Sequence, residues 1–170
     1  MSLTLPGPLV DAEWLAAQLG DPRLRVIDVT YVMPGSGRDA RAEFEAKHVP
    51  GAVYFDIDDI GDPVSELPHM LPTPARFAEK VGALGIGNDD AVVAYDSYGL
   101  MSAARGWWMF RVFGHDNVAV LDGGLRAWTA AGQPLETGPA APAPARFKAG
   151  FRPALVRSLG NISANLQSGA

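Results

Sequence analysis

The chain has 170 residues, of which 48% are hydrophobic, so it is long enough to form one domain with a full core. Its formal net charge is −5 and it has no run of Lys or Arg, which argues against binding to nucleic acid or to an anionic membrane surface. No apolar stretch is long enough to span a bilayer, and the first residues lack the pattern of a signal peptide. We therefore expect a cytoplasmic protein.

The chain contains no cysteine, which excludes disulfides, thiolate metal sites and thiol nucleophiles within these residues. The three histidines, His48, His69 and His115, are far apart in the sequence and show no metal-ligand spacing. We predict neither a metal site nor a cofactor.

The first half of the chain alternates amphipathic segments with short apolar runs. These patterns predict helices over residues 10–19 and 38–47 and strands over residues 24–29 and 53–55. The segment 56–72 has neither a helical nor a strand period and is rich in acidic residues and proline. A loop of this length inside a compact domain is usually functional.

The second half contains the most regular pattern. A helix is predicted to begin after Thr73, which serves as its N-cap, with Pro74 at the first helical position. Two continuous apolar runs, 91–95 and 118–121, are typical of strands buried on both faces. A helix with little polar surface, predicted from near Leu100, joins them into a right-handed parallel β–α–β unit.

The composition changes after the helix that ends near residue 132. The following residues are rich in Pro, Ala and Gly, which is typical of an extended linker or surface strap. A new amphipathic helix is then predicted from Asn161. We divide the chain into a domain at 1–135, a linker or strap at 136–160 and, at 161–170, the start of a second domain that is missing.

The turn after the strand at 91–95 is the first place to look for function, because ligands of open parallel sheets bind beyond the carboxyl ends of the strands. In the turn from Asp96 to Gly99, backbone N–H groups and the next helix N-terminus are expected to stabilise a negative charge. A Cys at the first position would become a reactive thiolate. Asp96 is already an anion and cannot carry a persulfide.

Four stretches of the chain occur in a recognisable order and spacing. They are His48-Val49-Pro50-Gly51-Ala52 with Phe55-Asp56-Ile57-Asp58, then Leu67 to Pro72, Ala104 to Arg111, and Leu121 to Trp128. Together they resemble the rhodanese family, and closely the N-terminal domain of two-domain thiosulfate and 3-mercaptopyruvate sulfurtransferases. The resemblance implies an α/β rhodanese-like domain, with a doubly wound parallel sheet of about four or five strands and helices on both faces.

The resemblance also implies how a whole protein would work. In that family the catalytic Cys opens a C-x-x-G-x-x loop in the C-terminal domain. The N-terminal domain usually has Asp at the position of this Cys. Here Asp96 stands at that position, and Gly99 stands at the position of the loop glycine. The chain would be the non-catalytic half of a sulfurtransferase that moves sulfur from thiosulfate or 3-mercaptopyruvate to a thiol or cyanide through a cysteine persulfide. Alone it is predicted to be inactive.

The expected partners follow from the same resemblance. They are the missing C-terminal catalytic domain and a small sulfur donor in the cleft between the two domains. Exposed interdomain surface is also expected to let the fragment form a homodimer.

Asp58 and His69 are the candidate site residues of this chain. The resemblance implies that segment 56–72 faces the cleft, where the pair would assist a serine of the missing domain in proton transfer. A carboxylate fixes the imidazole tautomer, and the imidazole carries a proton near neutral pH. The alternative is that His69 only orders a proline-rich loop.

The other motif residues are predicted to be structural. For Arg105 and Arg111, on the central helix, we favour surface or interdomain ion pairs over substrate binding. The full set of structural motif residues is His48, Pro50, Gly51, Gly99, Arg105, Asp122, Gly123, Gly124 and Trp128.

Two other functions stay open. One is an inactive rhodanese module used for binding or regulation. The remote one is a domain whose Asp96 accepts a phosphoryl group, with Asp28 as a second carboxylate for Mg²⁺. Against it, Tyr98 stands where the phosphatase motif has its second Asp, and no Lys follows Leu121 as a receiver domain requires.

Overall fold

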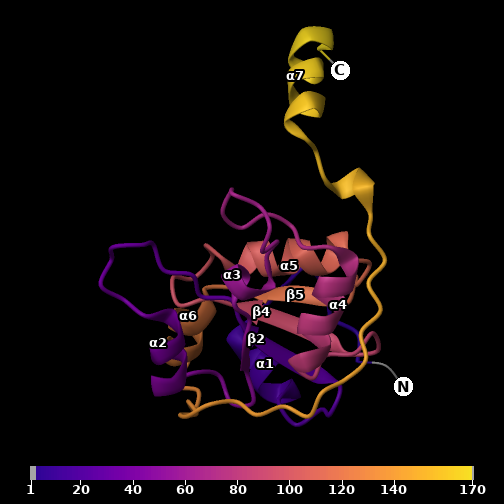
Figure 1. The fold of residues 1–170 in the computed structure, drawn as a ribbon. Helices are drawn as coiled ribbons and strands as arrows, with labels where there is room; N and C mark the ends of the chain where they lie inside the picture. Colours follow the sequence, from indigo (N-terminus) through magenta and orange to yellow (C-terminus); the bar gives the residue numbers. More distant parts are fainter. Residues whose placement is uncertain (1–2, 170) are drawn as a thin grey trace.

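A computed structural model describes residues 3–169 and shows five parallel strands in one sheet, in the order β1-β5-β4-β2-β3 (Figure 1). The strands are β1 (Leu9–Val10), β2 (Leu24–Asp28), β3 (Val53–Tyr54), β4 (Ala91–Tyr95) and β5 (Val118–Leu121). The predicted α/β class and parallel sheet are confirmed. β1 was not predicted, because two residues are too few to show a strand period.

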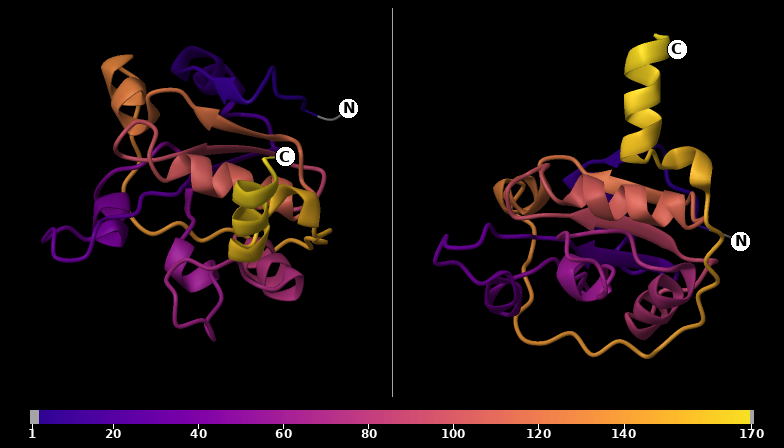
Figure 2. Two further views of the ribbon diagram at one scale, coloured as in Figure 1. Left: turned by 90° about the horizontal axis from the view of Figure 1, so that it is seen from above. Right: turned by 45° about the horizontal axis from the view of Figure 1, so that its top comes forward.

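Helices cover both faces of the sheet (Figure 2). One face carries α1 (Ala12–Gln18), α2 (Ala40–Ala46) and α6 (Gly124–Ala130). The other carries α3 (Ile57–Ile60), α4 (Pro74–Ala83) and α5 (Ala103–Val112). None of the helices among residues 3–169 is both long and apolar enough to cross a membrane.

The central strand β4 explains the continuous apolar run of the sequence. Val92 and Ala94 belong to the core under α4 and α5, whereas Val93 and Tyr95 belong to the core under α1, α2 and α6. Every residue of β4 is buried, as expected for a parallel strand covered on both sides.

The order of the strands places a crevice at the carboxyl ends of β2 and β4. These neighbouring strands are paired along their length, yet the chain leaves β2 toward α2 on one face and leaves β4 toward α5 on the other. Because the two connections diverge, the ends of β2 and β4 form the switch point at which open α/β sheets bind ligands.

After α6 the chain crosses the surface as an extended strap at residues 133–152. It is held by hydrogen bonds from the Ala145 N–H to the Gly82 carbonyl and from the Gly150 N–H to the Phe113 carbonyl, each 2.8 Å long. Phe147 is buried in the core beneath α4 and α5. The packed unit therefore extends beyond residue 135.

The last elements are a 3₁₀ turn, η1 (Pro153–Leu155), and α7 (Leu159–Ser168). α7 is the helix predicted near Asn161 and begins two residues earlier, where Ser158 forms a capping box with Asn161. It projects away from the sheet and helices, and none of its residues is buried (Figures 1 and 2).

Candidate functional site

The carboxylate of Asp96, at the end of β4, is enclosed by backbone N–H groups. Its Oδ1 accepts hydrogen bonds from the N–H groups of Tyr98 at 2.9 Å and Gly99 at 2.7 Å. Its Oδ2 accepts from Met101 at 2.7 Å and Ala103 at 2.9 Å. The side chain is fully buried. The turn therefore stabilises an anion, and that anion belongs to the chain itself.

The same hydrogen bonds change where the next helix begins. α5 starts at Ala103, three residues after the expected Leu100, and its N-cap Ser102 makes no side-chain capping bond. Asp96 takes this role from seven residues upstream, through the N–H of Ala103. The turn is longer than predicted because the carboxylate binds N–H groups along it before the helix begins.

The turn after β5 packs against the turn after β4. The N–H of Leu125 donates to the main-chain carbonyl of Asp96 at 2.9 Å. Gly123, at φ 72°, precedes the first residue of α6 and allows the abrupt change of direction. The Gly-Gly pair predicted to make a tight turn thus also forms one wall around Asp96.

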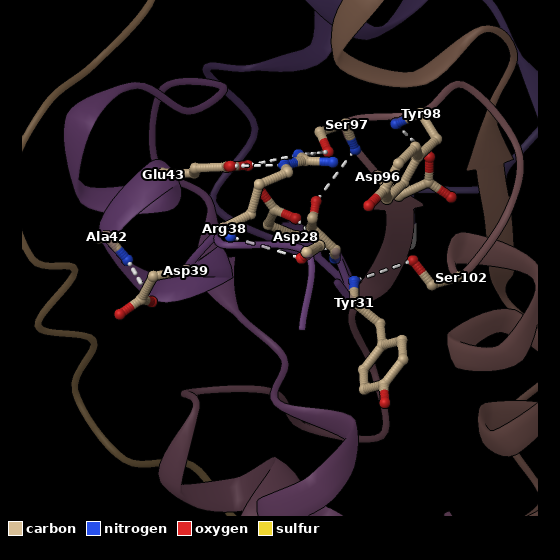
Figure 3. Close-up of polar contacts among 12 residues, drawn as sticks. Asp28, Tyr31, Arg38, Asp39, Ala42, Glu43, Asp96, Ser97, Tyr98 and Ser102 are labelled. Atoms are coloured by element: carbon tan, nitrogen blue, oxygen red, sulfur yellow. Dashed lines mark hydrogen bonds and ion pairs between the residues drawn. The ribbon is translucent and has the colours of Figure 1, made fainter. Parts of the chain in front are cut away.

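A polar network anchors the other side of the turn (Figure 3). The Ser97 N–H donates to Thr30 Oγ1 at 3.0 Å, and the Thr30 N–H donates to Asp28 Oδ1 at 2.8 Å. Arg38 pairs with Glu43 and donates to Ser97 Oγ at 3.2 Å. Burial raises the pKa of the Asp28 carboxyl, and its hydrogen bonds from Thr30 oppose that rise.

These contacts disfavour the phosphoryl-accepting interpretation of Asp96. An acceptor carboxylate needs an oxygen free to attack phosphorus and a neighbouring group on Mg²⁺. Both oxygens of Asp96 are bonded to backbone amides in a site closed to solvent. Within residues 3–169, no group of three or more acidic or imidazole side chains could hold a metal ion.

The structure brings the two candidate site residues together. Asp58 lies in α3, a single helical turn within the segment expected to be irregular, and its N–H is capped by Asp56. The Nδ1 atom of His69 lies 2.9 Å from Asp58 Oδ1, and the two side chains are 32% and 64% exposed. Nδ1 makes no hydrogen bond of good geometry with any residue in the range 3–169, so this close approach is a polar contact and not a well-formed hydrogen bond.

His48 and Trp128 have the surroundings of structural residues. The ring of His48 is buried and stacks on Phe44 at 4.1 Å, and its Nδ1 lies 2.7 Å from the Phe44 carbonyl oxygen. The backbone of His48 pairs with Glu136 of the strap. Trp128 is fully buried and donates from Nε1 to the Pro134 carbonyl at 2.8 Å.

The two arginines of α5 differ. Arg111 faces Asp116 at 3.6 Å, in keeping with the surface ion pair expected for it. Arg105 makes no ion pair with any residue in the described range 3–169, so the surface ion pair expected for it is absent there, and an interdomain ion pair stays a prediction. Its guanidinium instead donates to the His69 carbonyl and lies 4.6 Å from the ring centroid of Trp108.

A cavity of about 480 Å³ opens beside His69. Its walls come from the loop after α3, from Arg105 and Trp108 of α5, and from Phe151 and Arg157 of the C-terminal segment. The sequence contained no signal for this arrangement, because the three walls come from segments far apart in the chain.

Comparison with known proteins identifies the family. The Rhodanese-like domain model matches residues 11–131. The chain belongs to the rhodanese family. The rhodanese-like chain is 48% identical over 166 residues to human 3-mercaptopyruvate sulfurtransferase, covering 94% of this chain and 56% of that protein. It is 40% identical over 187 residues to mitochondrial thiosulfate/3-mercaptopyruvate sulfurtransferase 1 of Arabidopsis thaliana, covering 98% and 49% of the two.

A solved structure agrees with these relatives. SseA of Escherichia coli, described as a 3-mercaptopyruvate sulfotransferase with the rhodanese fold, superposes with a TM-score of 0.90 at 37% identity. The match covers 95% of this chain and 62% of SseA. The rhodanese-like chain spans about half the length of the curated relatives it matches.

Proposed function

We propose that this chain is the non-catalytic N-terminal domain of a sulfurtransferase that uses 3-mercaptopyruvate or thiosulfate. The observation that carries the proposal is Asp96 in the anion-binding turn after β4. The turn offers four N–H groups to a negative charge, as a sulfur-carrying thiolate would require, but the chain fills it with its own carboxylate. The nucleophile must then come from a second rhodanese domain.

Exposed apolar side chains around this end of the sheet support a partner domain there. Leu100 and Met101, in the Asp96 turn, are 58% and 45% exposed, and Leu67 and Met70, in the loop after α3, are 64% and 45% exposed. Large apolar side chains left exposed near one another are a feature of interaction sites. We infer that the catalytic domain covers it and that a cleft lies between the two domains.

The chemistry defines what this domain would supply. A cysteine thiolate attacks the sulfur of 3-mercaptopyruvate, the carbon–sulfur bond breaks, and the electron pair leaves with the carbon as the enolate of pyruvate. The enzyme keeps the sulfur as a persulfide, and the enolate needs a proton to become pyruvate. With thiosulfate, sulfite leaves with the electron pair and no carbon has to be protonated.

Asp58 and His69 are suited to deliver that proton. The Asp58 carboxylate lies 2.9 Å from Nδ1 and can fix the orientation of the imidazole, a group that carries protons near neutral pH. The Asp58 side chain is exposed and the His69 side chain is partly exposed, as a pair that works against a partner domain must be. A close contact without a well-formed hydrogen bond fits an unliganded site, because catalytic hydrogen bonds often tighten only when substrate binds.

A hybrid protein tests this proposal. The chain replaces the matched N-terminal part of human 3-mercaptopyruvate sulfurtransferase, and pyruvate and thiocyanate formation are measured with the two donors. We expect the hybrid to be active and the 170-residue chain alone to be inactive. In the hybrid, His69→Gln should lower kcat with 3-mercaptopyruvate by about 10²-fold and should lower kcat with thiosulfate much less.

Glu66→Gln, on the same exposed loop, is the matched control and should change neither rate. Turnover by the pure chain would contradict the assignment as a non-catalytic half. A folded hybrid without activity would favour the inactive binding module. Equal losses with both donors would show that His69 orders the loop and does not transfer a proton.

A further inference from the structure

His69 has an unusual backbone conformation. Its φ is 58°, and it is the one non-glycine residue in the described range 3–169 with a positive φ. A residue with a side chain is strained in this left-handed region and persists there only when the surrounding structure holds it. His69 lies in a long loop whose ends alone do not fix its conformation.

The contact that holds the backbone comes from α5. The Nη2 group of Arg105 donates to the carbonyl oxygen of His69, across 36 residues of sequence. The guanidinium is itself fixed over the ring of Trp108, 4.6 Å from the ring centroid. Stacking and a directed N–H fork are properties of Arg that Lys does not share.

Arg105 is costly to place in this way. Burial lowers the pKa of its guanidinium, and within residues 3–169 no carboxylate lies within ion-pair distance to offset the loss of hydration. Its Nε–H is buried without a hydrogen-bond partner. Neither a surface ion pair nor simple packing explains why the half-buried guanidinium of Arg105 has the His69 carbonyl as its hydrogen-bond partner.

The backbone held by Arg105 determines where the imidazole points. With φ at 58°, the His69 ring meets the ring of Tyr31 edge-on at 4.7 Å and brings Nδ1 to Asp58. A return of His69 to the common negative-φ conformations would redirect the ring away from both neighbours.

We propose that Arg105 is a positioning residue, which holds the His69 backbone so that the imidazole pairs with Asp58 and faces the cleft. Its role in catalysis rests on the proton-transfer function proposed above. The position of Arg105 in turn depends on Asp96, which binds the N–H of Ala103 at the first residue of α5. The carboxylate of Asp96, which stands at the position of the family's catalytic Cys, thus helps to position the proposed proton-transfer pair of Asp58 and His69.

The first test uses the 170-residue chain and needs no catalytic partner. His69 is the most exposed of the three histidines, since His48 and His115 are buried, so diethyl pyrocarbonate should modify it first. We expect Arg105→Met to abolish the nuclear Overhauser contacts between the His69 and Tyr31 rings and to change the modification rate of His69. Arg105→Lys should restore these contacts in part and also guards against failure of the Met variant to fold.

Arg111→Met is the matched control, because Arg111 lies on the same helix and its guanidinium lies over Trp107 at 4.9 Å. It should leave the His69 signals unchanged. Unchanged ring contacts and modification rate in a folded Arg105→Met chain would overturn the proposal, whatever the activity of the hybrid.

The second test uses the hybrid protein. With 3-mercaptopyruvate, Arg105→Met should lower kcat about 10- to 100-fold with little change in KM, the range expected when a reacting group is displaced by about 1 Å. In the His69→Gln background the same substitution should have no further effect, because Arg105 acts through His69. Additive losses would overturn the positioning role, and an inactive hybrid would count against the proposed function alone.

Discussion

Gly124 lies directly against the main-chain carbonyl of Asp96, so that a Cβ on Gly124 would stand 2.3 Å from that oxygen. Gly124 also has a φ of 56° and follows Gly123 at 72°. Because backbone meets backbone, neither side can yield as a flexible side chain would. The turn after β5 therefore fixes the position of the turn after β4, and with it the enclosure of the Asp96 carboxylate.

Gly124→Ala should lower the free energy of unfolding by about 3 kcal/mol, from the left-handed conformation and from overpacking together. Urea denaturation measures this loss. Gly132→Ala is the control, because Gly132 has a φ of 69° and nothing within 4 Å of its would-be Cβ. It should cost only about 1 kcal/mol. Equal losses would mean that backbone conformation alone, and not contact with Asp96, accounts for Gly124.

The N–H groups around Asp96 should lower the pKa of a thiol placed among them. Asp96→Cys introduces the sole thiol of a chain without cysteine, and thiolate absorbance near the ultraviolet cut-off reports its titration. We expect a midpoint well below the ordinary value of about 8.5, because N–H donors and the α5 N-terminus favour the thiolate.

Ser163→Cys, on the exposed helix α7, is the reference for that titration and should keep an ordinary midpoint. If the two thiols titrate with the same midpoint, the turn does not stabilise an anion, contrary to what its hydrogen bonds indicate. A lowered midpoint alone would not make the chain a sulfurtransferase, because Gly99, Tyr98 and Met101 already close the site over the side chain.

Local patterns predicted the centre of this fold. The continuous apolar runs at 91–95 and 118–121 specify strands buried on both faces, and an abrupt turn after the first run predicted the N–H groups around Asp96. Those features depend on neighbours in the sequence. The pairing of Asp58 with His69 was implied by family resemblance, since nothing in residue spacing alone shows that α3 and the later loop meet.

The contacts that sequence reasoning missed are long-range. Arg105 and Tyr31 reach His69 from other elements of the fold, 36 and 38 residues away in the numbering. Phe147 follows a Pro- and Ala-rich stretch that resembles a linker, yet it enters the core. Composition describes the local stiffness of such a segment but does not say which surface it crosses.

His115 should make the stability of the domain depend on pH. Its side chain is buried beside Phe110 and Phe147, and its Nε2 has no partner among residues 3–169. Burial lowers the pKa of the imidazole below its ordinary value of 6.5. The unfolded chain then binds more protons than the folded one between that lowered pKa and 6.5, so stability should fall as pH decreases through this window.

Urea midpoints measured from about pH 8 down to pH 5 show this loss of stability. For one titrating group, the free energy of unfolding cannot change by more than about 1.4 kcal/mol per pH unit. His115→Leu should flatten the curve in this range. The raised pKa of Asp28 acts in the opposite sense, since its folded form binds the extra proton and loses stability as pH rises. The contribution of Asp28 is the same in both chains, so it cancels when the pH curve of His115→Leu is subtracted from that of the parent chain. If the two curves of urea midpoint against pH run parallel, His115 is not the source of the pH dependence.

The strap should contribute to folding through one side chain. Phe147 is 6% exposed and lies within 5.7 Å of Phe77 and 6.1 Å of Phe110, measured between ring centroids. Phe147→Ala should therefore cost about 3 to 5 kcal/mol, the usual range for removing a buried phenyl ring. Phe151→Ala, four residues later and 46% exposed, should cost less than about 1 kcal/mol. A loss from Phe147→Ala as small as that from Phe151→Ala would place the strap outside the core, and a chain cut at residue 135 would then fold as well as the full one.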